Sequence, residues 1–412
     1  MESSMRARVA FAFVVLLLPA IVFASSAPVT EADAVRLFLE ESPRARSVPV
    51  VAQSVGAELR VDSRVSNPSV AYQIEDAAGV RDDFLTFEQE LPITGRRGLL
   101  RQRAAAASSA AGLAAEREVQ VDAYTMKAVF YEVLYRERVL HRLQRGTERL
   151  ERVVDILGRR EHEGEGSGYD LLRAEQELVA TRIATAKAEV ALSVARSRFG
   201  SFFDPVLMME AVVLDGDLET TGADSDPDNA VEQALSQRAD LRALVAEAER
   251  QDLERRAARR RRFPEPTLTA GWKRTQVLNL EDTGFIAALS VPLPIFDHGQ
   301  RTAERATADR QRIELESEIL QREIRAEVQA ALARERVARQ AAQRYGEDVE
   351  RRAGELRAIA QIAYDEGESG ILELLDAHRS SLTMELLALA ARYEAKSAEI
   401  ERDRAIGIEV KP

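Results

Sequence analysis

Hydrophobic residues recur at every third or fourth position over long stretches of the chain, which predicts amphipathic helices. From about residue 96 to 160 proline is absent and glycine is sparse, and apolar residues repeat every seven positions. This heptad pattern is typical of a coiled-coil seam. At ~1.5 Å per residue, such a helix would reach on the order of 100 Å. The seam consists of Met126, Val133, Leu140 and Val154 beside Val129, Leu143, Leu150 and Leu157, with interruptions at Arg136 and Thr147.

Four short segments instead alternate between apolar and small or polar residues, which predicts β-strands. The first pair is expected at about 69–75 and 84–91 around a loop at 76–83, and the second within 267–292 around a loop at 275–283. Alternation alone fits both a half-buried soluble hairpin and a lipid-facing one, because the two share a period of two. The aromatic candidates for a lipid-facing band, or for core packing, are Tyr72, Phe87, Trp272 and Phe285.

The order of these features repeats after about 200 residues. Each half predicts helix, strand, loop, strand, long helix, turn and long helix. We therefore divide the chain into a first half at 25–201, with long helices at 96–200, and a second half at 230–412, with long helices at 299–405. The segment 202–229 joins the halves and is a candidate collar. The matching pairs are Arg136–Val139 with Arg334–Val337, Gly164-Glu165 with Gly367-Glu368, Leu171-Leu172 with Leu374-Leu375, and Leu91–Ile93 with Leu293–Ile295.

The N-terminus has the three parts of a secretory signal peptide: Arg6 and Arg8, an apolar run from Val9 to Phe23, and small residues from Ala24 onward. The apolar run is shorter than the roughly 20 residues of a spanning helix, so cleavage after residues 1–24 is favoured over a membrane anchor. The chain contains no cysteine, which excludes a cysteine-linked lipid and disulfides. Because no later apolar stretch is long enough to span a membrane as a helix, any span is expected to be β-structure.

Charge and motifs argue against several functional classes. The net charge of −12, from 57 basic and 69 acidic residues, disfavours nucleic-acid binding. The basic run Arg255–Arg262 could by itself bind nucleic acid or anionic lipid, but before a strand in an acidic exported chain we interpret it as a solvated helix end. The four histidines are scattered and no nucleophile or phosphate-loop motif is present, so we predict no metal site, no cofactor and no enzyme.

Four short strands cannot close a membrane barrel, whose smallest single-chain forms have about eight strands. The missing strands would therefore come from other copies of the chain. Two copies would supply about eight strands and three about twelve, and the larger barrel leaves room for an aqueous channel.

The duplicated order and three motifs resemble the TolC-like outer-membrane efflux proteins over nearly the whole mature chain. The motifs are Leu91–Gly98 after the second strand, Val291–Phe296 after the fourth, and Gly367–Ala377 at a helical turn. The resemblance implies a mainly α fold with a small β part: a homotrimer with a 12-stranded barrel in the outer membrane and a helical tunnel in the periplasm. It also implies a periplasmic adaptor and an inner-membrane pump as partners. The residues of the first two motifs are most similar to those of the heavy-metal-efflux branch of the family.

Two glycine-containing stretches interrupt the helical patterns and predict the turns of helical hairpins. In the family that the chain resembles, these turns are the periplasmic tips that meet the adaptor, and nearby acids narrow the aperture. Simple helix–helix loops, and acids that favour a helix N-terminus, are the alternative interpretation. The tip candidates are Gly164, Glu165, Gly367, Glu368 and Ser369, and the aperture candidates are Asp170, Glu373 and Asp376.

The main alternative function is a periplasmic coiled-coil adaptor or scaffold without a barrel. It would share the signal peptide and the long helices, but it would need only one helical hairpin. Two hairpins in repeated order, each after a strand pair, favour the channel.

Overall fold

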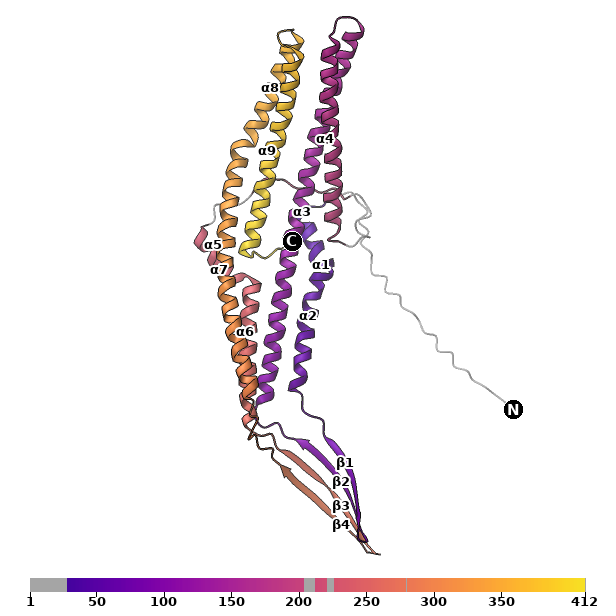
Figure 1. The fold of residues 1–412 in the computed structure, drawn as a ribbon, viewed down its shortest axis with the longest axis vertical. Helices are drawn as coiled ribbons and strands as arrows, with labels where there is room; N and C mark the ends of the chain where they lie inside the picture. The colour runs from indigo at the N-terminus through magenta and orange to yellow at the C-terminus, as the bar shows by residue number, and fades with distance from the viewer. Residues whose placement is uncertain (1–27, 204–211, 221–225, 279, 412) are drawn as a thin grey trace, which may run out of the picture.

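Long helices carry most of the chain, and the computed structural model describes residues 28–203, 212–220, 226–278 and 280–411. The predicted signal peptide at 1–24 lies outside the described residues. The molecule is elongated, with the strands at one end and two helical hairpins at the other (Figure 1). Among the described residues, none of the helices combines the length and hydrophobicity needed to cross a membrane.

The first helical hairpin confirms the predicted coiled-coil seam. Helix α3 (Arg96–His162) has 67 residues, and α4 (Gly168–Gly200) returns beside it. Met126, Val129 and Val133 of the seam are at most 1% exposed. Such burial of one stripe is the packing that the seven-residue repeat predicts.

The second hairpin is built from three helices. Helix α7 (Gln300–Tyr345) is followed directly by α8 (Glu347–Asp365), and α9 (Ile371–Ile406) returns beside both. The break at Gly346, where ψ is −76°, was not predicted from the heptad pattern.

Each half begins with two short helices where one was predicted. Helix α1 (Glu31–Glu41) stops at Ser42, where Pro43 starts α2 (Pro43–Arg60), and α5 (Pro227–Gln237) is separated from α6 (Ala239–Arg259) at Arg238. Single 3-10 turns, η1 (Val61–Ser63) and η2 (Arg260–Arg262), then lead into the strands.

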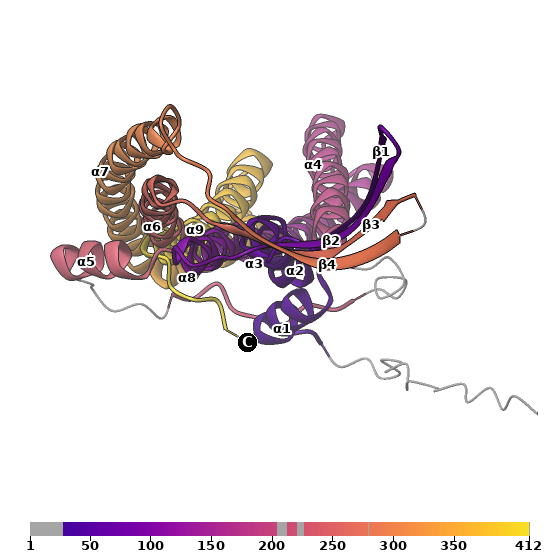
Figure 2. The same ribbon diagram turned by 90° about the horizontal axis from the view of Figure 1, so that it is seen from below.

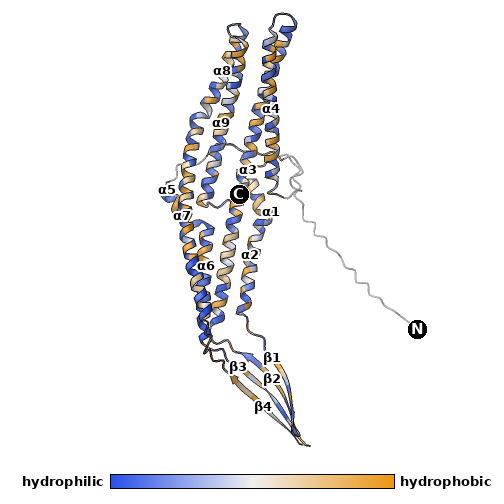
Figure 3. Ribbon diagram, viewed as in Figure 1, coloured by the Kyte–Doolittle hydropathy of each residue, from blue (hydrophilic) through white to orange (hydrophobic). Residues whose placement is uncertain are grey.

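The helices lie side by side as a wall (Figure 2). Near the strands, the helices lie next to one another in the order α2, α3, α6 and α7. Toward the tips, the order is α4, α3, α9 and α8. Each level therefore contains a row of four helices. Hydrophobic and hydrophilic residues are interleaved along all of them, as expected for helices that bury one face (Figure 3).

The described part of the connecting segment packs against the middle of α3. Val29 forms a parallel bridge with Leu214, and Leu218 is buried in the same core cluster as Phe130. Arg138 of α3 donates a hydrogen bond of 2.8 Å to the carbonyl of Gly216. The predicted collar thus has a fixed inner contact, and its further contacts stay a prediction.

The strands form one antiparallel sheet in the order β1-β2-β3-β4. Strands β1 (Ser69–Ala77) and β2 (Val80–Glu90) come from the first half, and β3 (Thr267–Val277) and β4 (Leu280–Ser290) come from the second. The central pair β2–β3 therefore joins the two halves. The mainly α architecture with four strands is confirmed.

The predicted loops at 76–83 and 275–283 are wrong, because the strands continue almost to the tips of the hairpins. Two acidic residues of the first predicted loop pair with β3 instead: Asp83 contacts Arg274 at 3.1 Å, and Asp82 contacts Lys273 at 2.8 Å. Only Ala78 and Gly79 separate β1 from β2, and both have positive φ (53° and 79°). Two such residues are typical of a type I′ hairpin turn.

Candidate functional site: the helical tips and the sheet

The two helical turns lie at the same end of the molecule, as predicted (Figure 1). Gly164 (φ 77°) follows α3, and Gly367 (φ 75°) follows α8, so each helix ends at a left-handed residue that suits glycine. Glu165 and Glu368 are exposed beside them, whereas Ser369 is half-buried. The turns are confirmed, and their contact with an adaptor stays a prediction.

One apolar cluster holds both hairpins together close to the tips. It includes residues from α3, α4 and α9, with partly buried Ala360 and Tyr364 from α8 packed against it. The two hairpins therefore share a core at this level. The buried members are Leu150, Val153, Leu157, Ala174, Leu178, Ile371, Leu374 and Leu375.

An ion pair reinforces this junction. Arg379 of α9 donates from Nε and Nη2 to the two carboxylate oxygens of Glu177 of α4, at 3.0 and 2.5 Å. A bidentate pair of this kind fixes orientation as well as distance.

The three aperture candidates lie on the two helices that this ion pair connects. Asp170 is in the first turn of α4, two turns before Glu177, and Asp376 is one turn before Arg379 on α9. Glu373 accepts a hydrogen bond of 3.1 Å from the backbone N–H of Gly370, so it also caps α9. A capping role and a role at the aperture are compatible.

Farther from the tips, a buried polar node connects α3, α8 and α9. The carboxylate of Glu385 on α9 accepts hydrogen bonds from Arg357 at 2.7 Å and from Arg142 at 3.1 Å, and Arg142 also contacts Glu350 at 3.2 Å. Burial alone would raise the pKa of Glu385, but the hydrogen bonds and charges of Arg357 and Arg142 outweigh it and hold this pKa below its ordinary value. Glu385 is therefore ionised and holds two guanidinium groups.

His378 lies between this node and the tips. Burial, with the nearby charges of Arg357 and Arg149, lowers its pKa to about 4. Its Nε2 atom is shielded from solvent and has no hydrogen-bond partner among the described residues. The imidazole is consequently neutral at pH 7.

The aromatic candidates of the strands lie on one face of the sheet. Cross-strand pairing places Tyr72, Leu85, Trp272 and Phe285 in a single row. Their exposed fractions in the single chain are 60%, 46%, 66% and 89%. Phe87 lies in the adjacent row, opposite Val70 and Ala270. These side chains form no buried core within the chain.

The opposite face of the sheet is mostly polar. Its rows include Glu75–Asp82–Thr275–Asp282 and Ser69–Glu88–Thr269–Ala288. Lys273 and Thr275 both contact the carboxylate of Asp82. The sheet is thus amphipathic in its part nearest the helices, whereas toward the hairpin tips the Tyr72 face also becomes charged, with Asp83 and Arg274 in one row.

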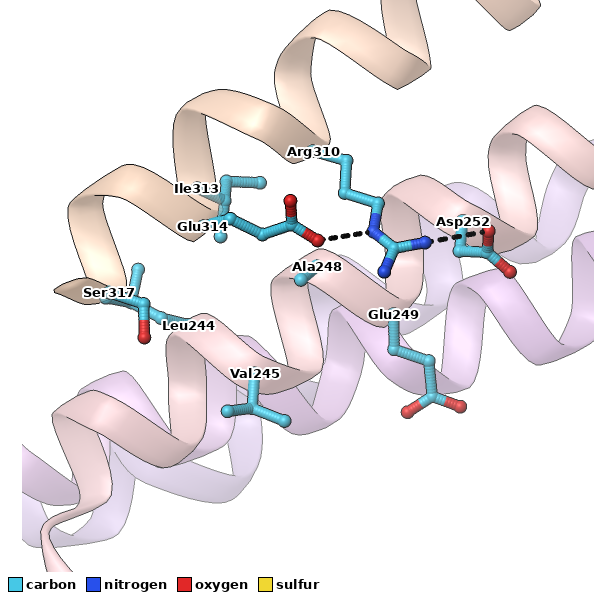
Figure 4. Close-up of a pocket in the computed structure, with 9 residues that line it drawn as sticks. All are labelled: Leu244, Val245, Ala248, Glu249, Asp252, Arg310, Ile313, Glu314 and Ser317. Atoms are coloured by element: carbon cyan, nitrogen blue, oxygen red, sulfur yellow. Dashed lines mark hydrogen bonds and ion pairs between the residues drawn. The ribbon is translucent and has the colours of Figure 1, made fainter. Parts of the chain in front are cut away.

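A shallow groove lies between α6 and α7 (Figure 4). Arg310 crosses it and contacts Asp252 at 3.2 Å and Glu314 at 2.9 Å. The single cation of the groove, Arg310, is therefore already paired with two carboxylates. Within the described ranges, no three His, Cys, Asp or Glu residues are grouped as a metal would require.

Sequence reasoning missed the Glu177–Arg379 pair and the Glu385 node. The signal for the node was present, because Ser381 and Glu385 occupy positions of α9 that continue the buried stripe of Leu374 and Leu375. A polar residue at a seam position predicts a buried partner. Its partners, Arg142 and Arg357, could not be identified from the sequence, because that requires knowing how α3 and α8 are aligned along α9.

Comparison with known proteins identifies the family. Residues 230–407 match the model of the family described as outer membrane efflux protein. No curated protein matches the chain.

Solved structures share the fold over nearly the full length. A membrane protein from Pseudomonas aeruginosa has a TM-score of 0.74 and 18% identity, with 92% of this chain and 93% of that chain covered. The Campylobacter jejuni CmeC outer membrane channel has a TM-score of 0.74 and 13% identity, with 98% and 94% covered. The Neisseria gonorrhoeae MtrE outer membrane channel, in its open state, has a TM-score of 0.72 and 17% identity, with 93% and 90% covered.

The second half of the chain carries the family's domain, and the fold of the whole chain is that of the outer-membrane channels. The adaptor or scaffold alternative would not produce this match. The chain therefore carries the outer membrane efflux protein domain at residues 230–407 and shares the fold of TolC-like outer-membrane channels over nearly its full length.

Proposed function

We propose that three copies of the chain assemble into one exit duct, which passes small solutes from an inner-membrane pump and a periplasmic adaptor to the outside. The duct catalyses no reaction and needs no cofactor. The observation that carries the proposal is the amphipathic four-stranded sheet, whose outer strands β1 and β4 each pair on one side only.

An open sheet edge is unfavourable in lipid, because its unpaired N–H and C=O groups find no water. Pairing β4 of one copy with β1 of the next removes both edges. Two copies of four strands would give eight, a barrel that its own side chains fill, whereas three copies give twelve. Three is therefore the smallest number that leaves an aqueous lumen.

The two faces of the sheet suit such a barrel. The apolar face, with Tyr72, Phe87, Trp272 and Phe285, would contact lipid, and the polar face around Asp82 would line the lumen. Alternating lipid-facing and lumen-facing residues are the pattern of transmembrane barrels.

The edges of the helical wall also carry unpartnered apolar stripes. On α4, the stripe is spaced by seven and four residues, the spacing of a coiled-coil seam without a partner. On the opposite edge, α7 and α8 carry a second one. Head-to-tail packing of these two edges closes a ring. The stripes are Leu172, Val179, Ile183, Val190 and Val194 on α4, and Val337, Tyr345, Leu356, Ile359 and Ile362 on α7 and α8.

In this assembly the tips would meet the adaptor through Gly164, Glu165, Gly367, Glu368 and Ser369. Three copies of Asp170, Glu373 and Asp376 would place carboxylates around the narrow end of the tunnel. Rings of acidic side chains favour the passage of cations. The transported substrate, including the metal ions suggested by the sequence motifs, stays a prediction.

The test is the mass and location of the mature protein. We expect a trimer in detergent, extracted from the outer-membrane fraction, with channel conductance in planar bilayers. A monomer or dimer in the soluble periplasmic fraction would contradict the proposal.

A further inference from the structure

The chain crosses between helices and strands four times, and all four crossings lie at one level of the molecule (Figure 1). They comprise residues 61–68, 91–95, 260–266 and 291–299, which we call the junction belt. Large apolar side chains in the belt are 44–90% exposed. These side chains are Val61, Val65, Ile93, Phe263, Val291, Leu293, Ile295 and Phe296.

The junction belt also concentrates arginines without carboxylate partners. Arg64 and the four consecutive arginines at 259–262, of which Arg259 ends α6 directly before the belt, are exposed, and none forms an ion pair with any described residue. Arg262 lies over the ring of Phe263, with 4.8 Å between its Cζ atom and the ring centroid. At the start of α3, Arg96 Nε and Arg97 Nη1 are shielded from solvent and lack a hydrogen-bond partner within the described part of the chain.

Elsewhere on the described helices, unpaired exposed arginines, such as Arg325 and Arg336, stand singly, and others are paired. Arg312 and Arg351 contact the carboxylates of Glu316 and Glu355 one turn away, at 2.5 and 2.7 Å. In a chain with a net charge of −12, a run of unpaired guanidinium groups is unusual. The end of α6 nearest the strands is correspondingly hydrophilic (Figure 3).

The carboxylates at this level have other partners. Asp62 pairs with Arg103 at 2.6 Å, Glu90 accepts a hydrogen bond from Ser66 at 2.6 Å, and Glu265 accepts one from Thr94 at 2.6 Å. Asp297 accepts one from the backbone N–H of Gly299 at 2.9 Å. The guanidinium groups of the belt are therefore free to bind a partner outside the chain.

We infer that the junction belt binds the phosphate-bearing headgroups of the membrane leaflet on the helix side, with its apolar side chains at the boundary of the hydrocarbon. The inference rests on the proposed function, which places the adjoining apolar face of the sheet in lipid. Guanidinium groups donate paired hydrogen bonds to phosphate, and arginine stems lie along apolar surface while the charge stays in the headgroup layer.

The chemistry of the belt favours a lipid leaflet over a protein partner. Exposed Leu268 and Leu289 at the ends of β3 and β4 continue the apolar face of the sheet directly into the belt. A band that is apolar on the strand side and cationic on the helix side matches the change from hydrocarbon to headgroup. These contacts would fix the depth of the protein in the membrane.

The test compares lipid binding by purified full-length protein in native mass spectrometry. Phosphatidylglycerol and phosphatidylcholine are titrated separately into wild type, the variant Arg259→Gln/Arg260→Gln/Arg261→Gln/Arg262→Gln, and a matched control. The control, Arg312→Gln/Arg322→Gln/Arg351→Gln/Arg352→Gln, removes the same charge from exposed arginines that contact carboxylates. Oligomeric mass and helical circular dichroism establish that each variant is folded.

We expect wild type and control to bind phosphatidylglycerol more strongly than phosphatidylcholine. In the belt variant, the amount of bound phosphatidylglycerol should be at least fivefold lower than in wild type. A second variant, Leu293→Ser/Phe296→Ser, is expected to be removed from liposomes by milder detergent than wild type. Equal retention of the two lipids by wild type, or an equal loss in both arginine variants, would overturn the inference. Conductance in the same preparations separates the two proposals: a conducting channel without lipid preference refutes only the belt, whereas a protein that neither inserts nor conducts refutes both.

Discussion

Arg379 on α9 donates two hydrogen bonds to Glu177 on α4 and so joins the two helical hairpins close to their tips. Arg379 lies one turn after the aperture candidate Asp376, and Glu177 lies two turns after Asp170. The two hairpins can therefore move apart at this level only if this ion pair breaks.

Replacing Arg379 should loosen the tip without unfolding the protein. Arg379 is more than half exposed, so Arg379→Gln should cost at most about 1 kcal/mol of stability. We expect an increase in single-channel conductance. The control Arg182→Gln removes a pair with Glu151 inside the first hairpin. If both variants conduct like wild type, the pair does not hold the tip.

The Glu385 node should contribute much more to stability. Its side chain is only 5% exposed, and Glu385→Ala would leave Arg142 and Arg357 without their shared carboxylate. Removing one partner of a buried pair costs about 3–5 kcal/mol. Thermal unfolding followed by circular dichroism should show a clear fall in midpoint. Glu401→Ala, which breaks an exposed pair with Arg334, should change little, and similar midpoints for the two variants would refute a special role of the node.

The lowered pKa of His378 predicts that the folded protein loses stability in mild acid. Its pKa is about 4 in the folded protein and about 6.5 when unfolded, so between these values the unfolded chain binds a proton that the folded chain does not. Stability conferred by neutral His378 is therefore complete above pH 6.5 and falls as the pH drops toward 4. Allowing for partial exposure, the loss is about 1–2 kcal/mol.

The measurement is the unfolding midpoint between pH 7 and 4.5. His378→Gln should reduce its dependence on pH, whereas His141→Gln, at an exposed position, should not. Parallel curves for wild type and His378→Gln would show that other groups cause the acid sensitivity.

Two strand glycines offer a matched test of the sheet. A Cβ at Gly271 would lie 2.3 Å from the carbonyl oxygen of Leu85, whereas a Cβ at Gly284 would meet nothing within 4 Å. Gly271→Ala should force β2 and β3 apart, at a cost of about 1–3 kcal/mol. We expect oligomers of Gly271→Ala to dissociate at lower temperature in detergent gels, and oligomers of Gly284→Ala to behave like wild type. The reverse order would contradict the pairing of β2 with β3.

Periodicity was sufficient to predict the helical part of the fold, because burial of a seam requires the seven-residue repeat that Leu143, Leu150 and Leu157 display. It was insufficient at the ends of the strands. Asp82 and Asp83 look like loop residues in the sequence, and only their contacts with Lys273 and Arg274 of β3 make them compatible with a strand. The break at Gly346 likewise does not alter the apolar spacing.

The turns at Gly164 and Gly367 could be predicted, since glycine interrupts a continuous pattern there. The ion pair between Glu177 and Arg379 could not, because its partners are 202 positions apart and meet only through the packing of α4 on α9. Charged residues are abundant along both helices. Identifying this pair among them requires knowing how α4 and α9 are aligned along their length.

The most direct test of the account is cross-linking between copies at the edges of the sheet. The chain has no cysteine, so Tyr72→Cys in β1 can be combined with a cysteine in place of each of Thr283, Phe285, Ala287 and Leu289 in β4 without background. A control with Tyr72→Cys and Trp272→Cys places the pair in β1 and β3, which are separated by β2.

After mild oxidation of membranes, we predict that at least one β1–β4 combination gives covalent dimers and trimers on denaturing gels and no larger species. The control should stay monomeric. Monomers in every β1–β4 combination, or a ladder beyond the trimer, would contradict a closed barrel shared by three copies.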